Sequence, residues 1–432
     1  MTLSGSPYQG YLYAYPHKMA YRPLVPRPAL RDVWAAEAKD SLFLYVHIPF
    51  CEMRCGFCNL FTRTRPPAEQ VSAYLTQLRA QASAVADSIG PVRYSRAAIG
   101  GGTPTFLTAA ELADLFSVLD LDPALPLSVE TSPATATADR LEVLAAHGTH
   151  RLSMGVQSFI DAEAHAAGRP QRRSQVDQAL ETIRTFDFPV LNLDLIYGIP
   201  GQTVETWAFS LRTALSWRPE EIYLYPLYVR PLTGLGKRHS GDPDPSWDAQ
   251  RLSLYSYGRD LLRDAGYEQL SMRQFRRFGV PTVDGPDYCC QDDGMVGLGC
   301  GARSYTRELH YSFDYAVSIG EVRGIIDDYL ARPPSDFAFA EHGFALDAHE
   351  QRLRWLLKSL LRAEGADLAA YESRFGNAVL DDFPHLSDLD SWAVLTPERF
   401  VLTDDGLARS DAIGPWLVSD TVRARMTSAL IR

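Results

Sequence analysis

Apolar residues along this chain form short runs that alternate with helical patterns. Six runs have the length and composition of buried strands: LFLYVHI (42–48), RAAIG (96–100), LSVET (127–131), RLSMGV (151–156), VLNLDLIYG (190–198) and EIYLYPLYV (221–229). Between the first two runs, apolar residues over 71–78 follow the i, i+3, i+4, i+7 spacing of one helix face, and the Gly-Pro pair at 90–91 ends that helix. Similar helical patterns recur near 112–119, 141–145 and 204–211.

This alternation indicates a parallel sheet, because parallel strands are joined by right-handed crossovers that usually contain a helix. Strands that are apolar almost throughout fit burial on both faces of such a sheet. Six strand–helix units are fewer than a closed eight-fold barrel requires. We therefore predict an α/β fold built on an open, three-quarter (β/α)6 TIM-like barrel.

The two ends of the chain have a different pattern. Residues 1–40 are rich in Tyr and Pro and lack helical periodicity, so we expect an extended arm that lies on the main domain. The barrel with its extension is assigned to 41–335, and 344–432 to a small helical domain. A Gly/Pro/Asp-rich loop is expected at 236–248, and a terminal hairpin at FVLTDDGL (400–407).

Composition narrows the possible partners and location. The 432 residues are 46% hydrophobic and 22% charged, with a net charge of −11 from 42 basic and 53 acidic residues. This charge argues against nucleic acid or an anionic membrane as a partner. No stretch approaches the roughly 20 apolar residues of a membrane span, and residues 1–20 contain no apolar run typical of a secretory signal. We expect a cytoplasmic, reducing setting, where clustered cysteines indicate metal binding or catalysis rather than disulfides.

Three of the six cysteines lie in one short segment, CEMRCGFCN (51–59). Cys51, Cys55 and Cys58 follow the end of the first strand, at the edge where parallel α/β folds form active sites. They could be unrelated buried thiols or zinc ligands, although structural zinc usually has four protein ligands. A [4Fe–4S] cluster on three thiolates would leave one iron open to another ligand. Gly56 would let the loop turn tightly.

Further candidate residues follow the other strands. GGGTP (100–104) comes directly after the second strand, where it is either a plain tight turn or a segment whose backbone N–H groups approach an anionic ligand. Glu130, Gln157 and Asp194 interrupt apolar strands near their C-terminal halves. Such groups are costly to bury without partners. They either hydrogen-bond within the barrel or line its mouth.

The segment YVHIPFCEMRCGFCN (45–59), followed by GGTP (101–104), resembles the cluster loop of radical S-adenosylmethionine (SAM) enzymes. More narrowly, the chain from about residue 41 to its end resembles the oxygen-independent coproporphyrinogen III oxidase-like family, which includes haem chaperones and class C radical methyltransferases. The resemblance implies a [4Fe–4S] cluster on the three cysteines and SAM on the open iron, where an electron cleaves SAM to a radical that abstracts a substrate hydrogen. It also implies a reductase or flavodoxin-type electron donor and a small-molecule or tetrapyrrole substrate. Residues 344–432 resemble the small helical, winged-helix-like domain of the family.

The same resemblance assigns roles to individual residues. Tyr45, Gly101 and Glu130 match contacts to the SAM bound at the cluster, and Tyr45 joins the three cysteines as a catalytic residue. Other residues match positions that line a second SAM site in relatives: Phe57, Gly102, Thr103, Gln157, Arg169, Asp194, Tyr228 and Leu270. We therefore expect one SAM at the cluster and, as a hypothesis, a second SAM that each turnover would also consume.

The chain also departs from the family pattern. True oxidases carry a further cysteine just after the motif, where this chain has Asn59, and an Asp and a His where it has Arg273 and Gln274. Three functions stay open: an oxidase-like enzyme, a methyltransferase that uses both SAM molecules, and a haem chaperone. His47 could be a haem ligand, but its place inside a buried strand favours a core histidine.

Three basic residues near 270–277 suggest a substrate contact: Arg273, Arg276 and Arg277. Guanidinium groups pair with carboxylates, so these residues either clamp the propionates of a tetrapyrrole or form a solvated basic face. The Tyr-rich arm, with His17 and Lys18, could fold over the substrate mouth. Cys289, Cys290 and Cys300 could hold an auxiliary cluster, but their spacing fits no common pattern and ordinary thiols are preferred.

Overall fold

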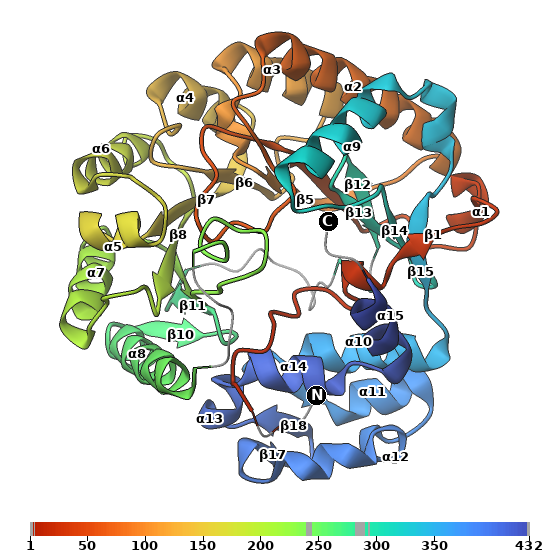
Figure 1. Ribbon diagram of the computed structural model, residues 1–432. Helices are drawn as coiled ribbons and strands as arrows, with labels where there is room; N and C mark the ends of the chain where they lie inside the picture. The colour runs from red at the N-terminus through yellow and green to blue at the C-terminus, as the bar shows by residue number, and fades with distance from the viewer. Residues whose placement is uncertain (1–2, 4, 239–243, 281–289, 293, 430–432) are drawn as a thin grey trace.

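The computed structural model describes residue 3 and residues 5–238, 244–280, 290–292 and 294–429. Its centre is a run of six parallel strands that are adjacent in chain order. They are β2 (Leu42–Ile48), β5 (Tyr94–Gly101), β6 (Leu127–Thr131), β7 (Thr149–Gln157), β8 (Val190–Tyr197) and β9 (Glu221–Pro226). Figure 1 shows the crossover helices on the outside of the curved sheet. The predicted open six-stranded barrel is confirmed.

The helices that cover the strands include those predicted near 71–78, 112–119, 141–145 and 204–211, whereas the two helices between β7 and β8 were not predicted. The covering helices are α2 (Ala68–Ile89), α3 (Ala109–Leu119), α4 (Ala138–Ala146), α5 (Asp161–Ala166), α6 (Arg173–Ile183), α7 (Val204–Ser216) and α8 (Pro245–Asp264). Helix α2 ends at Gly90, whose positive φ of 74° suits glycine. In β2, Leu44 and Val46 pack between sheet and helices, while Tyr45 packs in a small cluster with residues of the arm and β12. Alternate residues of the strand therefore serve the core and the barrel interior.

Short strands extend the sheet at both edges, and the sequence patterns did not predict them. Beyond β2 lie β12 (Met295–Leu298), β13 (Arg303–Tyr305), β14 (Leu309–Ser312), β15 (His342–Ala345) and β1 (Arg22–Pro23). Beyond β9 lie β11 (Gln274–Arg277) and β10 (Tyr267–Gln269). Only β12 pairs in parallel, with β2, and the others are antiparallel. With two to four residues each, these strands are too short for a period-two pattern to be recognised.

After α9 (Ile319–Ala331), the C-terminal part forms a second core. It contains α10 (Ala348–Leu360), α11 (Leu368–Phe375), α12 (Val379–Asp382), a sheet in the order β16 (Ala366–Asp367), β18 (Arg399–Leu402), β17 (Ala393–Leu395), and then α13 (Asp404–Leu407), α14 (Ser410–Leu417) and α15 (Asp420–Ser428). We predicted a terminal hairpin, and this was wrong, because three helices follow the hairpin. Pro415 inside α14 hid that helix from the sequence pattern. The division into domains 41–335 and 344–432 stays a proposal, which the two separate cores support.

The N-terminal arm is mostly irregular, with only the turn η1 (Lys18–Ala20), β1 and α1 (Leu30–Val33). Figure 1 shows it crossing the middle of the molecule between the two edges of the sheet. Three of its tyrosines each stack on an arginine of another element, at 4.1 Å for Tyr8 on Arg251, 3.8 Å for Tyr11 on Arg273 and 4.7 Å for Tyr13 on Arg303. Cation–π contacts of this kind stabilise packing. The arm thus links α8 and the β11 edge to β13.

Among the described helices, none combines the length and the apolar content needed to cross a bilayer.

Candidate active site

The three clustered cysteines lie on the loop that leaves β2 through β3 (Phe50–Cys51), which pairs with β4 (Arg63–Thr64). All three are free and only partly exposed. Their sulfur atoms face different neighbours, with Cys51 Sγ 3.6 Å from Thr103 Oγ1, Cys58 Sγ 3.9 Å from Thr62 Oγ1, and Arg169 Nη1 3.8 Å from Cys55 Sγ. In the described part of the chain, no three His, Cys, Asp or Glu side chains converge on one metal ion.

This arrangement fits a cluster of several irons better than a single ion, because each thiolate of a [4Fe–4S] cluster binds its own iron. Burial raises the pKa of the Cys51 thiol to about 12 and also raises the pKa of Cys58. Thiols must lose their protons to bind iron, so loading a cluster would release protons.

Gly56 fixes the cysteine loop against the loop after α5. Its N–H donates to the Gly168 carbonyl at 3.1 Å, and its own carbonyl accepts from the Leu235 N–H at 2.7 Å. A Cβ atom at Gly56 would lie 2.8 Å from the Ala167 carbonyl oxygen and 3.0 Å from Gly168 Cα. The predicted tight turn is present, since the Cys58 N–H donates to the Cys55 carbonyl at 3.1 Å. Glycine is needed here for the close backbone contact as well.

His47 joins three loops of the site. Its Nε2 lies 3.0 Å from the Phe61 carbonyl, to which it donates, so Nδ1 accepts from the Tyr45 hydroxyl at 3.2 Å. Cβ atoms at Gly101 and Gly301 would lie 2.5 Å and 2.8 Å from its ring, and both glycines have positive φ. Burial lowers the pKa of His47 to about 4, so the ring is neutral. The prediction of a satisfied core histidine is confirmed.

The GGGTP segment does not offer its N–H groups as we predicted. The Gly101 N–H donates to Glu130 Oε2 at 3.1 Å, the Gly102 N–H to the Ile48 carbonyl at 2.8 Å, and the Thr103 N–H to the Phe50 carbonyl at 2.8 Å. These three donors are engaged because the segment packs directly on the chain leaving β2. The interpretation of an N–H cradle is therefore corrected, although Thr103 does lie beside Cys51.

Two carboxylates line the barrel interior. Glu130 is accessible to water inside the barrel but enclosed by protein, which raises its pKa to about 7, with the nearby charge of Asp194 adding to the effect. Burial likewise raises the pKa of Asp194 to about 6, while the Asn192 side chain donates to it at 2.8 Å. Carboxylates with raised pKa values facing a cavity are typical of functional sites.

Gln157, Arg169 and Asp194 meet around Gly155. A Cβ atom at Gly155 would lie 2.7 Å from Gln157 Nε2 and 3.2 Å from Arg169 Nη1, and Gly155 pairs with Asp194 in the sheet. The register shifts between Gly155 and Gln157, whose φ is 69°. A β-bulge of this kind redirects a side chain. The structure thus brings together three residues that are distant in sequence.

Three other predicted SAM contacts are engaged in packing. The Tyr228 hydroxyl donates to Asp411. The Leu270 N–H donates to Gln274 at 2.8 Å, and its carbonyl accepts from Ala363 at 3.0 Å. Phe57 packs against the small apolar cluster that includes Ala167 and Leu235. A role for these residues toward a ligand stays a prediction.

The predicted carboxylate clamp is corrected by the structure. Each of its arginines already pairs with a carboxylate of the chain: Arg273 with Asp411, Arg276 with Glu221 at 2.8 Å, and Arg277 with Glu220 at 2.7 Å. These ion pairs engage all three guanidinium groups within the protein, although Glu221 and Glu220 each pair with a second arginine as well, Arg151 and Arg184. The sequence could not reveal the pairing of Arg273, since Asp411 lies 138 positions away.

The remaining cysteines show no second cluster among the described residues. Cys300 is buried with its sulfur 3.9 Å from the Tyr74 hydroxyl, and Cys290 packs beside the Ala14 and Met295 side chains. Cys289 lies outside the described residues. Cys300 is therefore an ordinary buried thiol, which was the preferred interpretation.

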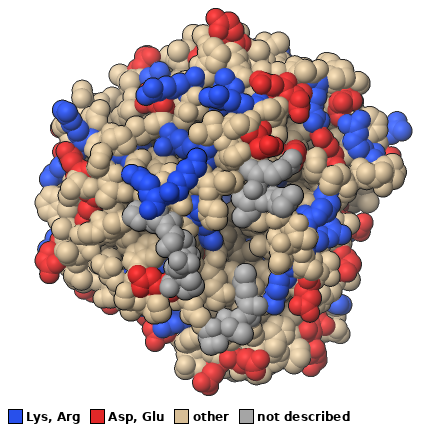
Figure 2. Space-filling model, in the orientation of Figure 1, with Lys and Arg blue, Asp and Glu red and all other residues tan. Residues whose placement is uncertain are grey.

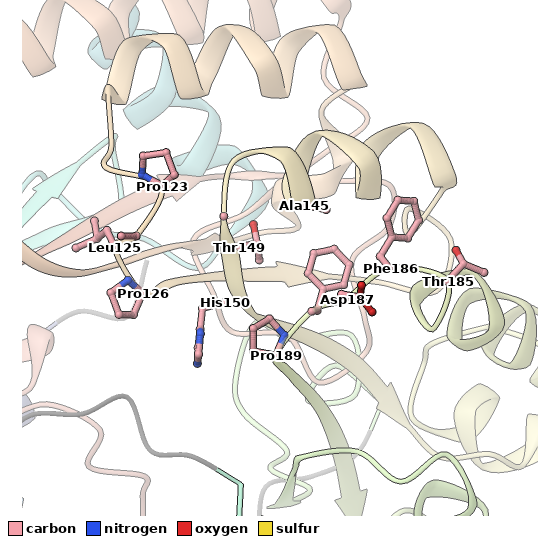
Figure 3. A pocket seen from close by; sticks show the side chains of 13 residues that line it. Pro123, Leu125, Pro126, Ala145, Thr149, His150, Thr185, Phe186, Asp187 and Pro189 are labelled. Carbon is pink, nitrogen blue, oxygen red and sulfur yellow. The ribbon is translucent and has the colours of Figure 1, made fainter.

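A cavity of about 540 Å³ lies away from this site, among the loops that precede β6, β7 and β8. Figure 3 shows Pro126, Thr149, His150 and Phe186 around it. These loops are at the opposite end of the strands from the cysteines, and the lining contains none of the predicted site residues. The candidate active site is therefore the cysteine loop with its neighbouring residues, and not this cavity.

Comparison with known proteins identifies relatives of this chain. The radical SAM superfamily model matches residues 45–214. The haem chaperone HemW of Haemophilus influenzae is 30% identical over 271 residues, covering 60% of this chain and 69% of that protein. The oxygen-independent coproporphyrinogen III oxidase of Salmonella typhimurium is 31% identical over 317 residues, covering 69% of this chain and 68% of that protein.

A solved structure has the same fold. Coproporphyrinogen III oxidase (HemN) from Escherichia coli, described as a radical SAM enzyme, superposes with a TM-score of 0.79 at 24% identity. The alignment covers 95% of this chain and 97% of that chain. The chain therefore belongs to the radical SAM superfamily, in the family that comprises the oxygen-independent coproporphyrinogen III oxidases and the HemW haem chaperones.

Proposed function

We propose that this protein is a radical SAM enzyme that abstracts hydrogen from a porphyrin-like or other organic substrate. The observation that carries the proposal is the set of three free thiols on one loop at the C-terminal end of β2, each with its own neighbour, beside GGGTP and Glu130. When bound, the cluster supplies an electron that cleaves SAM to a 5′-deoxyadenosyl radical. Membership of the superfamily supports the same cofactors.

The side chains of the site then have separable tasks. Cys51, Cys55 and Cys58 would hold the irons. Glu130 would accept hydrogen bonds from SAM, and its fixed position on the Gly101 N–H orients it for this. Tyr45 is kept in place by its hydrogen bond to the neutral His47 ring. All of these groups are on strands or on loops packed against strands, which limits their movement.

A second SAM molecule is part of the proposal. Gln157, Arg169 and Asp194 offer an amide, a guanidinium and a carboxylate around one point of β7. These groups complement the carboxylate and ammonium of an amino acid ligand. Calorimetry on the reconstituted protein should give two SAM molecules per chain, and a stoichiometry of one would reject this part.

There are two alternative functions. A methyltransferase would use the second SAM as methyl donor at the same three residues. A haem chaperone is favoured by the similarity to HemW and by Asn59, which stands where true oxidases carry a further cysteine. His47 does not support the chaperone, because both of its ring nitrogens are engaged within the protein.

The test begins with anaerobic reconstitution with iron and sulfide, reduction with dithionite and addition of SAM. Mass spectrometry should detect 5′-deoxyadenosine in the wild type and none in Cys55→Ala. Additional S-adenosylhomocysteine would favour the methyltransferase. Neither product in the presence of an intact cluster, together with tight haem binding, would favour the chaperone and reject the enzyme.

A further inference from the structure

Four basic residues from three parts of the chain gather beside the cysteine loop. His17 and Lys18 belong to the arm, Arg230 follows β9, and Arg303 lies on β13. The charges of Lys18, Arg303 and Arg230 all act on the His17 ring and, together with burial, lower its pKa to about 3. His17 is therefore neutral while three cations surround it.

Tyrosines hold these cations in place. The Arg303 side chain donates to the Tyr13 hydroxyl at 2.9 Å. The Lys18 Nζ lies 3.3 Å above the centre of the Tyr315 ring, and the Arg230 guanidinium 4.4 Å from that of Tyr228. The rings position the cations without supplying a carboxylate partner.

No Asp or Glu in the described ranges forms an ion pair with Lys18, Arg230 or Arg303, whereas Arg273 and Arg276 each have one. The chain carries a net charge of −11, so acidic groups are not scarce. Gathering like charges away from bulk water costs free energy unless an anion joins them. The arrangement is that of a site prepared for an anionic ligand.

The site borders the proposed reaction centre. The Tyr315 hydroxyl beneath Lys18 donates to the Asn59 carbonyl at 2.7 Å, one residue after Cys58. The charge of Arg303 also acts on Tyr45, the proposed SAM contact. Figure 2 shows basic side chains near the hollow at the centre of the face that the arm crosses. An anion held here would lie next to the cysteine loop.

We propose that Lys18, Arg230 and Arg303 bind carboxylates of the substrate, taking the place of the clamp first assigned to Arg273, Arg276 and Arg277. This inference rests on the proposed function. The ligand class is an organic acid with at least two carboxylates on an apolar frame, because the cations come from separate segments and each lies against an aromatic ring. The propionates of a tetrapyrrole meet this description, and the carboxylate of SAM shares the chemistry.

Binding experiments on the full-length, anaerobically reconstituted protein can separate these sources. The probes are coproporphyrin III, its methyl ester and SAM, with porphyrin binding followed by fluorescence and SAM binding by calorimetry. The variants are Lys18→Gln, Arg230→Gln and Arg303→Gln. Lys237→Gln is the matched control, because Lys237 is exposed in the segment that follows Arg230.

Each of the three variants should bind coproporphyrin III about tenfold to a hundredfold more weakly, the usual effect of losing one charged hydrogen bond. The control variant should bind coproporphyrin III as tightly as the wild type. The three variants should keep the wild-type affinities for the ester and for SAM. Arg303→Lys keeps the charge and should keep most of the affinity, and thermal unfolding identifies any variant that fails to fold.

Equal losses for the ester, a loss for SAM alone, or unchanged affinity would each overturn the inference. So would a wild type that binds no coproporphyrin III. SAM cleavage on the same samples keeps the two proposals apart. Intact cleavage with any of these results rejects only the carboxylate site, whereas absent cleavage rejects the proposed function itself.

Discussion

Removing the carboxylate of Asp411 should destabilise the protein strongly. Asp411 and Arg273 form an ion pair in which the side chains are only 1% and 4% exposed, and the Tyr228 hydroxyl donates to the same carboxylate. In Asp411→Ala, a buried guanidinium and a buried hydroxyl both lose their acceptor. Breaking a buried pair in this way costs about 3–5 kcal/mol in the free energy of unfolding.

Urea unfolding followed by tryptophan fluorescence would measure the loss. Asp405→Ala is the control, because its side chain is 80% exposed and lies 4.0 Å from Arg409, so it should change stability by less than about 0.5 kcal/mol. The double variant Arg273→Met/Asp411→Leu removes both charges and should recover most of the loss. A loss in Asp411→Ala no larger than in the control would refute the reasoning and return Arg273 to the list of substrate contacts.

Three further predictions concern the site. Gly56→Ala should lower the iron content of the reconstituted protein, because the new Cβ would lie 2.8 Å from the Ala167 carbonyl oxygen. Gly324→Ala, with no atom within 4 Å of its Cβ, should keep its iron, and equal iron in both variants would contradict the steric argument. The pKa of Glu130 is raised to about 7, so its ionised fraction should rise from about pH 6 to about pH 8. The affinity for SAM in calorimetry should rise with it in the wild type and stay flat in Glu130→Gln. The same pH dependence of affinity in both proteins would exclude this carboxylate as a SAM contact. The pKa of His47 is lowered to about 4 in the folded state, so between about pH 6.5 and pH 4 the unfolded chain binds a proton that the folded chain does not. The free energy of unfolding should therefore fall as pH drops through this range, and less steeply in His47→Gln. Equal dependence on pH in both proteins would show that the ring does not titrate on unfolding.

The sequence alone predicted the parallel core and the place of the cysteine loop. LFLYVHI coincides with β2 and LSVET with β6, because a strand buried on both faces is a continuous apolar run that can be recognised locally. The spacing of Cys51, Cys55 and Cys58 is equally local, and so it indicated a cluster before any contact was known. Family resemblance added Gln157, Arg169 and Asp194, which periodicity could not select.

Only the tertiary structure decided which charges are free. Arg273, Arg276 and Arg277 look like an exposed basic segment in the sequence, but each forms an ion pair with an acidic residue on β9, just before it or in α14. Arg303 has no distinguishing sequence signal, yet the arm brings Tyr13 and Lys18 to its side of the barrel. A hydrophobic pattern records whether a residue is buried, whereas the partner of a charge depends on segments that meet only after folding.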